Sequence, residues 1–410
     1  MAKKTVADID VRGKRVLVRV DFNVPLDKNL HITDDRRIRG ALPTIKRILD
    51  GGGRVIGMSH LGRPDGERVA KYSLAPAAKR LAELLGQDVP IAADCIGPDA
   101  AKVVNALKDG QCCLLENLRF HKAEEIKDKK AKEDPGLRKQ KDEFAGQIAV
   151  FGDAYVNDAF GTCHRDNASM YTVPQLMKGK PQVIGFLVKK ELEFLGDAVA
   201  KPARPFVVVL GGAKVSDKIG VIDRLLSICD KILIGGAMSY TFFAADGQCV
   251  GHSLTEPDRF EEAKRLRKAG GDKLVLPVDT VVAARIEAGI STQVCTAGTM
   301  PSDLMGLDIG PATVAAYRKE ILAAKTIVWN GPVGVFETPP FDAGTMAIAK
   351  AVAEATGKGA VSIIGGGDSA AAIDKAGLES QMTHISTGGG ASLEYLEGRP
   401  FKPIDILDNA

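Results

Sequence analysis

Short, mostly apolar runs that alternate with longer helical stretches constrain the fold of this chain more than any other feature of its sequence. The runs VVVL at 207–210 and VSII at 361–364 show no regular alternation of apolar and polar residues, as expected of strands that are buried on both faces. Runs of this kind followed by helices are typical of parallel sheets covered by helices. The sequence therefore predicts an α/β fold.

The predicted strands fall into two groups, one in each half of the chain. The first group is 15–22, 54–59, 112–116, 148–156 and 182–187. The second group is 205–210, 231–234, 273–279, 326–329, 360–364 and 383–386. Because 410 residues exceed one ordinary hydrophobic core, we predict two Rossmann-like lobes, each a parallel sheet covered by helices.

A Gly-Lys-Pro break at 179–181 marks the predicted junction between the lobes. The helix predicted at 188–200 follows this break, and we interpret it as a hinge helix that joins the two domains. The first domain is then 1–180 and the second is 181–390. The charged stretch 122–143 contains Pro135-Gly136 and is predicted to be a solvated helical excursion on the surface.

Composition argues against several classes of partner. The chain has 55 basic and 52 acidic residues, a formal charge of +3 and 5% aromatics, so no basic patch or stacking platform for nucleic acid is expected. No apolar run reaches the roughly 18 residues that span a bilayer. The charged start MAKKTVADIDVRGK predicts no secretory signal. Seven scattered cysteines without CxxC spacing indicate reduced thiols in the cytoplasm.

Polar clusters follow the strands of the first half, where ligands of open parallel sheets bind. The clusters are 21–23, 59–64, 116–121 and 158–165, and Arg36, Arg37 and Arg39 lie in the loop after the first. Arginine thus appears after four successive strands. Four guanidinium groups at one sheet edge repel one another unless an anion lies between them, and arginine suits bidentate phosphate and carboxylate contacts. We predict a site for an acidic substrate.

Glycine-rich turns follow the strands of the second half. Gly211-Gly212-Ala213-Lys214 is predicted to open a helix that carries Lys214 and Lys218 on one face near its N-terminus, where a bound anion would favour them. The run 365–369 ends in Asp368-Ser369, and 388–390 is a third such turn. Amides at helix N-termini hold phosphates, and an aspartate beside them can hold Mg²⁺. Together these features indicate a polyphosphate ligand.

Two other motifs match in part, but the residues that their functions require nearby are absent. Residues 365–370 match G-x-G-x-x-A, but the next strand ends Ser386-Thr387 without the acid that holds a ribose. The tripeptide at 164–166 resembles a protein-kinase loop but has Tyr171 where asparagine is required. No P-loop is present, and the six histidines show no metal-ligand spacing.

In order along nearly the whole chain, long and unusual motifs are similar to those of the phosphoglycerate kinase family in its bacterial form. They are RVDFNVP (19–25), SHLGRP (59–64), ENLRFH (116–121), YVNDAFGT (155–162), GGAKVSDKI (211–219), GLDIGP (306–311), WNGPVGVFE (329–337), GGGDSAAA (365–372) and STGGGASLEYLEG (386–398).

The resemblance implies reversible phosphoryl transfer from 1,3-bisphosphoglycerate to ADP, giving ATP and 3-phosphoglycerate. It implies that the first lobe binds the glycerate through Asp21, Phe22, Asn23, Arg37, His60, Leu61, Gly62, Arg63, Arg119 and Arg165. It implies that the second binds the nucleotide through Lys214, Lys218, Gly306, Asn330, Glu337, Gly366, Gly367, Asp368 and Ser369, with Asp368 holding Mg²⁺. The last segment, about 391–410, would pack back onto the first lobe.

Phosphoryl transfer needs alignment and charge stabilisation more than covalent chemistry. We therefore assign Arg37 and Lys214 to the migrating phosphoryl group. We expect direct in-line transfer in a cleft that hinge motion closes, in a protein that acts as a monomer. One departure from the family is Cys163-His164-Arg165-Asp166-Asn167, where Asn167 replaces a histidine and Asp166 adds a negative charge.

Two other functions fit parts of the sequence. An NAD-dependent dehydrogenase on twin Rossmann lobes would bind nicotinamide, but the absent ribose acid weighs against it. A nucleotide or phosphosugar sensor would bind without turnover. An assay with 3-phosphoglycerate and MgATP separates these hypotheses from a kinase.

Overall fold

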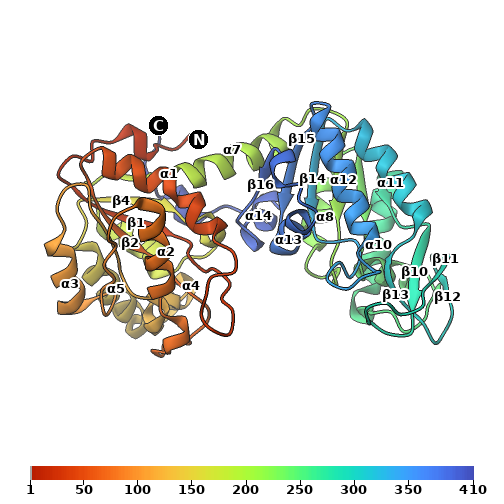
Figure 1. The fold of residues 1–410 in the computed structure, drawn as a ribbon, viewed down its shortest axis with the longest axis horizontal. Helices are drawn as coiled ribbons and strands as arrows, with labels where there is room; N and C mark the ends of the chain where they lie inside the picture. The colour runs from red at the N-terminus through yellow and green to blue at the C-terminus, as the bar shows by residue number, and fades with distance from the viewer. Residues whose placement is uncertain (1) are drawn as a thin grey trace. The chain divides into compact units, whose positions relative to one another are not determined.

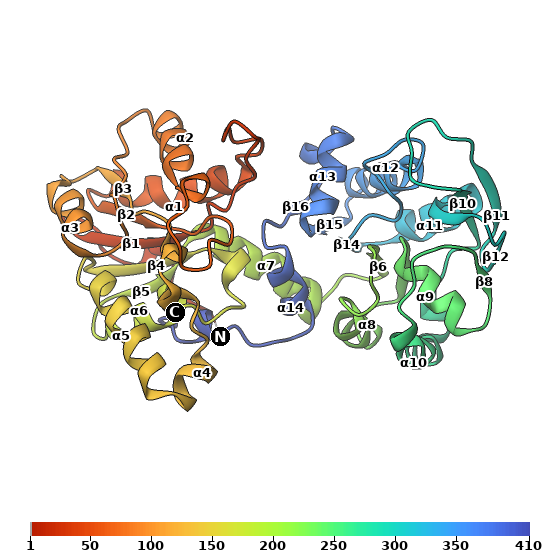
Figure 2. The same cartoon turned by 90° about the horizontal axis from the view of Figure 1, so that it is seen from below.

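The computed structural model describes residues 2–410 and, at 197–199, the backbone alone. It divides into unit 1 (Met1–Leu192 with Pro400–Ala410) and unit 2 (Glu193–Arg399). Helix α7 (Phe186–Ala200) runs through the first boundary, which the sequence prediction had placed at 180/181. Figures 1 and 2 show that each unit is a sheet flanked by helices, as an α/β fold requires.

The sheet of unit 1 is parallel throughout and has the strand order β3-β2-β1-β4-β5. Its strands are β1 (Arg15–Val20), β2 (Arg54–Met58), β3 (Cys112–Leu114), β4 (Ala154–Asp158) and β5 (Gln182–Ile184). The prediction of a strand at 148–156 was wrong for its first residues, since β4 begins only at Ala154. There, helix α5 (Pro135–Ala149) continues to Ala149, because Phe144 and Ile148 bury the same face of that helix.

Helices and short turns cover this sheet and connect its strands. The helices are α1 (Arg36–Asp50), α2 (Ala75–Leu85), α3 (Gly97–Ala106), α4 (Asp128–Glu133), α5, α6 (Val173–Leu176) and α15 (Lys402–Asp405). The short turns are η1 (Val6–Asp8), η2 (Ala70–Tyr72), η3 (Leu118–Phe120), η4 (Lys122–Glu125), η5 (Phe160–Thr162) and the π turn η6 (Ala168–Thr172). Figure 2 shows α1 and α2 on one face of the sheet and α5 on the other.

The C-terminal segment belongs to unit 1. The backbone N–H of Asp408 donates to the carbonyl of Gln182 at 2.8 Å, which extends the pairing beyond β5. The ring of Phe401 lies 5.9 Å from that of Phe160. The backbone N–H of Lys4 donates to the carbonyl of Asp408 at 3.0 Å, so the two ends of the chain meet beside β5.

The charged stretch 122–143 is only partly the solvated surface that the sequence predicts. Glu124, Asp128 and Lys141 are all buried. The Nζ of Lys141 donates to the carbonyl of Asp166 at 2.7 Å, and Asp128 pairs with Arg138 at 3.2 Å. Charge density along the sequence indicated exposure, but these particular groups have partners on other elements.

The main sheet of unit 2 has the order β16-β15-β14-β6-β7-β9, and each of its pairs is parallel. Its strands are β6 (Phe206–Leu210), β7 (Lys231–Ile234), β9 (Leu274–Val275), β14 (Thr326–Asn330), β15 (Val361–Gly365) and β16 (His384–Ile385). The helices of the unit are α8 (Ile219–Leu226), α9 (Met238–Ala245), α10 (Phe260–Gly270), α11 (Pro311–Ala323), α12 (Ala343–Gly357), α13 (Gly367–Lys375) and α14 (Gly390–Leu396). Its short turns are η7 (Pro257–Arg259), η8 (Gly271–Lys273) and η9 (Glu379–Gln381).

Unit 2 also contains two small sheets that the sequence prediction missed. The antiparallel sheet β11-β10-β13 consists of β10 (Asp279–Ala283), β11 (Gln293–Thr296) and β13 (Met305–Ile309), and β8 (Cys249–Val250) pairs with β12 (Thr299–Met300). Strand β11 is mostly exposed, so it lacks the buried apolar run on which the prediction relied. The strand predicted at 273–279 is in fact β9, and β10 begins where that prediction ended.

Candidate active site

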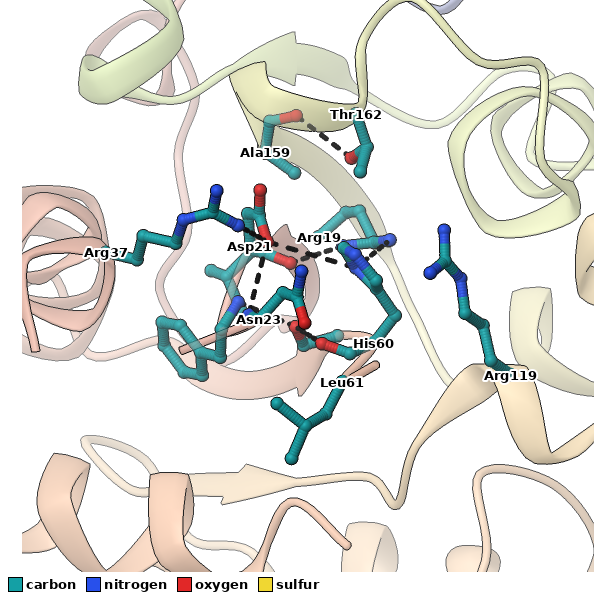
Figure 3. A network of polar contacts seen from close by, with 12 residues as sticks. Arg19, Asp21, Asn23, Arg37, His60, Leu61, Arg119, Ala159 and Thr162 are labelled. Carbon is teal, nitrogen blue, oxygen red and sulfur yellow. Dashed lines mark hydrogen bonds and ion pairs between the residues drawn. The ribbon is translucent and has the colours of Figure 1, made fainter. Parts of the chain in front are cut away.

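The carboxyl ends of the parallel strands in unit 1 carry the predicted arginine cluster. Arg37 lies in the first turn of α1, Arg119 in η3 after β3, and Arg165 after η5. Because β1 to β4 are neighbours in a parallel sheet, these residues share one sheet edge. Figure 3 shows Arg37 reaching Asp21 from α1, with Arg19, His60 and Arg119 also in view.

Asp21 is the acid of this cluster. It is buried, and Arg37 donates to its Oδ1 at 2.8 Å. Burial alone would raise the pKa of Asp21, but the charges of Arg37 and Arg19 and the bond from the backbone N–H of Asn23 hold that pKa below its usual value. The side chain of Arg37 is 31% exposed, so part of it is open to a ligand.

The loop at 60–63 is held by side chains from two other elements. The amide of Asn23 accepts from the backbone N–H of Gly62 at 2.8 Å, and Arg119 donates to the carbonyl of Gly62 at 2.7 Å. Gly62 has a φ of +62°, and a Cβ there would lie 2.3 Å from the ring of Tyr72. Only glycine fits this turn, which leaves the exposed Arg63 at its end.

Two residues of the predicted glycerate set lie with their side chains in the core. Phe22 and Leu61 are buried among the apolar residues of unit 1. The backbone N–H of Phe22 donates to the hydroxyl of Ser59 at 2.8 Å. These two positions can therefore reach a ligand only through backbone atoms.

The loop after β4 contributes a second basic pair. The Nε of Arg165 donates to the Nε2 of His164 at 3.0 Å. Burial, together with the charge of Arg165, lowers the pKa of His164 to about 4. His164 is therefore neutral at physiological pH, and the positive charge of this loop comes from Arg165.

Asn167 and Asp166 face the protein. Asn167 is 8% exposed, and its amide donates to Glu124 at 3.4 Å. The carboxylate of Asp166 lies 3.4 Å from Lys402, and its carbonyl accepts from Lys141. The departure from the family motif thus builds internal contacts.

Asn167→His places a larger ring beside the buried carboxylate of Glu124. We expect the melting temperature to fall, because overpacking of a filled site costs about 1–3 kcal/mol. We expect the KM for 3-phosphoglycerate to change only severalfold, since the new imidazole bonds to Glu124. Thermal unfolding and steady-state kinetics test this, with the exposed Asn29→His as control. A gain in substrate affinity of several orders of magnitude would contradict it.

The sequence analysis missed Arg19 as a functional candidate. Arg19 lies inside β1, is fully buried, and donates to the hydroxyl of Ser169 at 2.9 Å and towards the Nδ1 of His60 at 3.3 Å. A charged residue within the apolar run RVLVRV was the available signal. Its partners come from two distant segments, so sequence alone did not identify them.

In unit 2, the predicted phosphate-binding residues gather at the carboxyl ends of β6, β14 and β15. Lys218 is the N-cap of α8, is buried, and donates to the Oδ1 of Asn330 at the end of β14. Burial lowers the pKa of Lys218 to about 8, although the negative charges of Asp217 and Asp368 act to raise it. The Nδ2 of Asn330 is buried and has no partner among the described residues. A buried donor without a partner fits a site that binds an acceptor-rich ligand.

The expectation that Lys214 and Lys218 share a helix face was wrong. Helix α8 begins only at Ile219, and Lys214 lies exposed in the preceding loop. The backbone N–H of Lys218 bonds to the carbonyl of Val215, which closes a tight turn before the helix. The two ammonium groups therefore have different surroundings, one in solvent and one against Asn330.

The glycine-rich turn after β15 opens a helix, as predicted. Gly366 is the N-cap of α13, with a φ of +91°, and Gly367 and Asp368 are in the first turn. Asp368 is exposed, whereas Ser369 is buried and accepts from the backbone N–H of Gly331 at 2.6 Å. The backbone amides of this first turn and the carboxylate of Asp368 thus lie at one helix start.

Gly306 and Glu337 lie at a different place in unit 2. Gly306 is in β13 of the small antiparallel sheet, and its N–H donates to Ser253 at 2.9 Å. Glu337 is exposed in the loop after β14, and this loop is tied to β13 by a 2.8 Å bond from the N–H of Val335 to the carbonyl of Leu307. The structure therefore brings these two residues to one neighbourhood.

One group of metal-type ligands lies outside the predicted site. Asp94, Cys95 and His121 each place a ligand atom within 4.8 Å of the others. His121 already bonds to Asp94 at 2.7 Å, and the guanidinium of Arg68 lies 3.9 Å from the other oxygen of that carboxylate. We assign no metal to this group, because its acid is paired and a cation is close by.

The fold and these two sets of groups define a class, a two-domain α/β phosphotransferase. The phosphoglycerate kinase family model matches residues 6–399. Relatives named phosphoglycerate kinase, from Rhodopirellula baltica and Chlorobium phaeobacteroides strain BS1, are 58% and 52% identical over the whole of both chains. The solved structures of the phosphoglycerate kinases from Coxiella burnetii and Pyrococcus horikoshii are 38% and 31% identical, with TM-scores of 0.83. They cover 98% and 99% of this chain, which covers 98% of each of them.

The chain belongs to the phosphoglycerate kinase family. It is a transferase of glycolysis that moves a phosphoryl group reversibly between 1,3-bisphosphoglycerate and ADP, giving 3-phosphoglycerate and ATP. Membership of this family favours the kinase over the two alternative functions, the dehydrogenase and the sensor. No helix within residues 2–410 is long and apolar enough to cross a membrane.

Proposed function

We propose that unit 1 binds the phosphoglycerate and unit 2 binds the nucleotide in this reaction. The observation that carries the assignment is the cluster of Arg19, Arg37, Arg119 and Arg165 at one sheet edge of unit 1, where guanidinium groups outnumber the acids beside them. Such an excess of positive charge is favourable only with an anion present. Asp21, Asn23, His60, Gly62 and Arg63 complete the proposed site.

Arg37 and Lys214 are the proposed catalytic residues. The side chain of Arg37 is partly exposed beside Asp21, and Lys214 is exposed in the loop after β6. Positive charges aimed at the transferring group stabilise the charge that spreads over its equatorial oxygens in the transition state. The attacking carboxylate is already an anion, so no general base is needed.

Asp368 is the proposed Mg²⁺ ligand. Its carboxylate is exposed in the first turn of α13, next to the backbone amides of the helix N-terminus, which suit phosphate oxygens. Mg²⁺ prefers oxygen ligands and commonly takes one or two carboxylates together with substrate phosphates, so this position fits the ion. When bound, the ion neutralises charge on the phosphates. Lys218, Asn330 and Ser369, which lie at the same ends of the strands, are proposed to bind the nucleotide together with Gly306 and Glu337.

The proposal places a complete set of binding groups in one chain, which supports action as a monomer. All seven cysteines are unpaired in the structure, which supports a cytoplasmic location. A coupled assay with 3-phosphoglycerate and MgATP tests the function, and binding of each ligand to variants of each unit tests the assignment. Loss of 3-phosphoglycerate binding on Lys214→Ala alone would contradict the division of ligands between the units.

We expect both substrates together, and neither alone, to make the protein more compact. In-line transfer requires reacting atoms roughly 3–3.5 Å apart. Because each ligand has its groups in one unit, neither ligand alone offsets the cost of bringing the units together, with α7 as the proposed hinge. Small-angle scattering should show a lower radius of gyration only with both ligands. Equal radii in all four states would contradict hinge closure.

A further inference from the structure

Glu124 is a buried carboxylate whose role the reaction does not explain. It lies in η4, is fully buried, and accepts from the backbone N–H and the hydroxyl of Ser169 at 2.9 and 2.6 Å. It also accepts from Asn167. Burial raises the pKa of Glu124, and Arg19 with the Ser169 and Asn167 bonds opposes this shift. Burying a carboxylate is costly, so a group held in this way calls for an explanation.

The hydroxyl of Ser169 connects Glu124 to Arg19. Ser169 Oγ donates to Glu124 and accepts from the Nε of Arg19 at 2.9 Å. A hydroxyl has one proton to donate, so the acceptor on Glu124 fixes the direction of this bond. The guanidinium of Arg19 is thereby oriented within β1, and a second of its nitrogens bonds to the carbonyl of Val20.

Arg19 in turn determines the state of His60. The remaining nitrogen of Arg19 lies 3.3 Å from the Nδ1 of His60. A guanidinium can only donate, so Nδ1 must accept and the ring proton must be on Nε2. The Nδ1 of His60 is 3.9 Å from Asp21, which is too long for a hydrogen bond. Burial also lowers the pKa of His60 well below its usual value, so the ring is neutral.

We propose that Glu124 is a positioning residue for the phosphoglycerate site: acting through Ser169 and Arg19, it holds His60 as the tautomer with its proton on Nε2. Glu124 does not contact the substrate in this role, and the inference rests on the proposed function of unit 1. His60 then offers an N–H donor to an anion, without adding a charge. Through Asn167, the same carboxylate also anchors the loop that carries Arg165.

Two variants interrupt the chain of bonds at different points. Glu124→Gln removes the acceptor charge, and Ser169→Ala removes the bridging hydroxyl but keeps the backbone bond to Glu124. We expect each to lower kcat/KM for 3-phosphoglycerate about 10- to 100-fold, as loss of a hydrogen bond to a charged group does. The KM for MgATP should stay within about twofold. Thr172→Val is the matched control, because its hydroxyl is buried in the same turn without a partner in the described part of the chain.

The ¹⁵N chemical shifts of the His60 ring give a readout that a general loss of stability would not move. In the wild-type protein, Nδ1 should show the shift of an unprotonated nitrogen, and in both variants the two ring nitrogens should move towards a mixture of tautomers. An unchanged tautomer, or unchanged kinetics in a folded Ser169→Ala protein, would overturn the proposal. A wild-type protein that turned over no 3-phosphoglycerate would instead refute the proposed function, while the NMR result would still test the role of Glu124.

Discussion

Arg37→Ala is expected to lower kcat by a factor of about 10²–10⁵, the range for removal of an oxyanion donor or an arginine finger. The KM for 3-phosphoglycerate should change far less. Arg37 has a partly exposed side chain at the sheet edge, and one of its guanidinium nitrogens bonds to Asp21. We expect this exposed part to meet the migrating phosphoryl group in the transition state only.

Arg39→Ala is the matched control for this experiment. Arg39 lies on the same helix, pairs with Asp35 at 2.8 Å and is more exposed than Arg37, so we expect kcat to stay near the wild-type value. Thermal unfolding of Arg37→Ala must accompany the kinetics, because Asp21 loses its closest cation. A large rise in KM with normal kcat would make Arg37 a ground-state anchor instead.

Asp368→Ala is expected to lower turnover with MgATP by about a thousandfold, because charge stabilisation by a bound metal contributes several kcal/mol. The binding of 3-phosphoglycerate should be retained, since the proposed glycerate residues all lie in unit 1. Steady-state kinetics over a range of Mg²⁺ concentrations, with calorimetric titration of 3-phosphoglycerate, measures both effects.

Asp374→Ala provides the control on the same helix. Asp374 lies near the C-terminus of α13 and is exposed, so its loss should leave both turnover and Mg²⁺ dependence unchanged. Turnover of Asp368→Ala at the wild-type rate would remove Asp368 from the proposed metal site. Equal losses in the two variants would point to damage of α13 and not to a lost metal ligand.

The main sheets were predictable because a strand that is buried on both faces consists of a continuous run of apolar residues, which can be recognised in the local sequence. The runs that became β6 and β15 needed no knowledge of their neighbours to be recognised. Strand β11 was missed for the converse reason, since three of its residues are exposed and it is held by pairing to β10. A strand that is held mainly by pairing with a distant segment does not need a recognisable pattern of apolar residues in its own sequence.

The candidate site also has features that the sequence predicts and features that it does not. The sequence alone determined which sheet edge carries arginines and which carries glycine turns, because in a parallel sheet the residue after each strand must lie at the same edge. It did not determine that Lys218 meets Asn330, or that Lys214 and Lys218 lie outside a common helix. Both depend on where α8 begins.

Only the tertiary structure decided how the buried polar groups are connected. Arg19 and Ser169 are 150 positions apart, and Ser169 and Glu124 are 45 apart. Their bonds form because each group, once buried, must find a partner that the fold brings to it. The charge of a residue can be read from the sequence, but burial and the choice of partner come from packing between distant segments. For that reason Glu124 fell in a stretch predicted to be solvated, and Asn167 in a loop predicted to contact the substrate, whereas both lie in the interior of the protein.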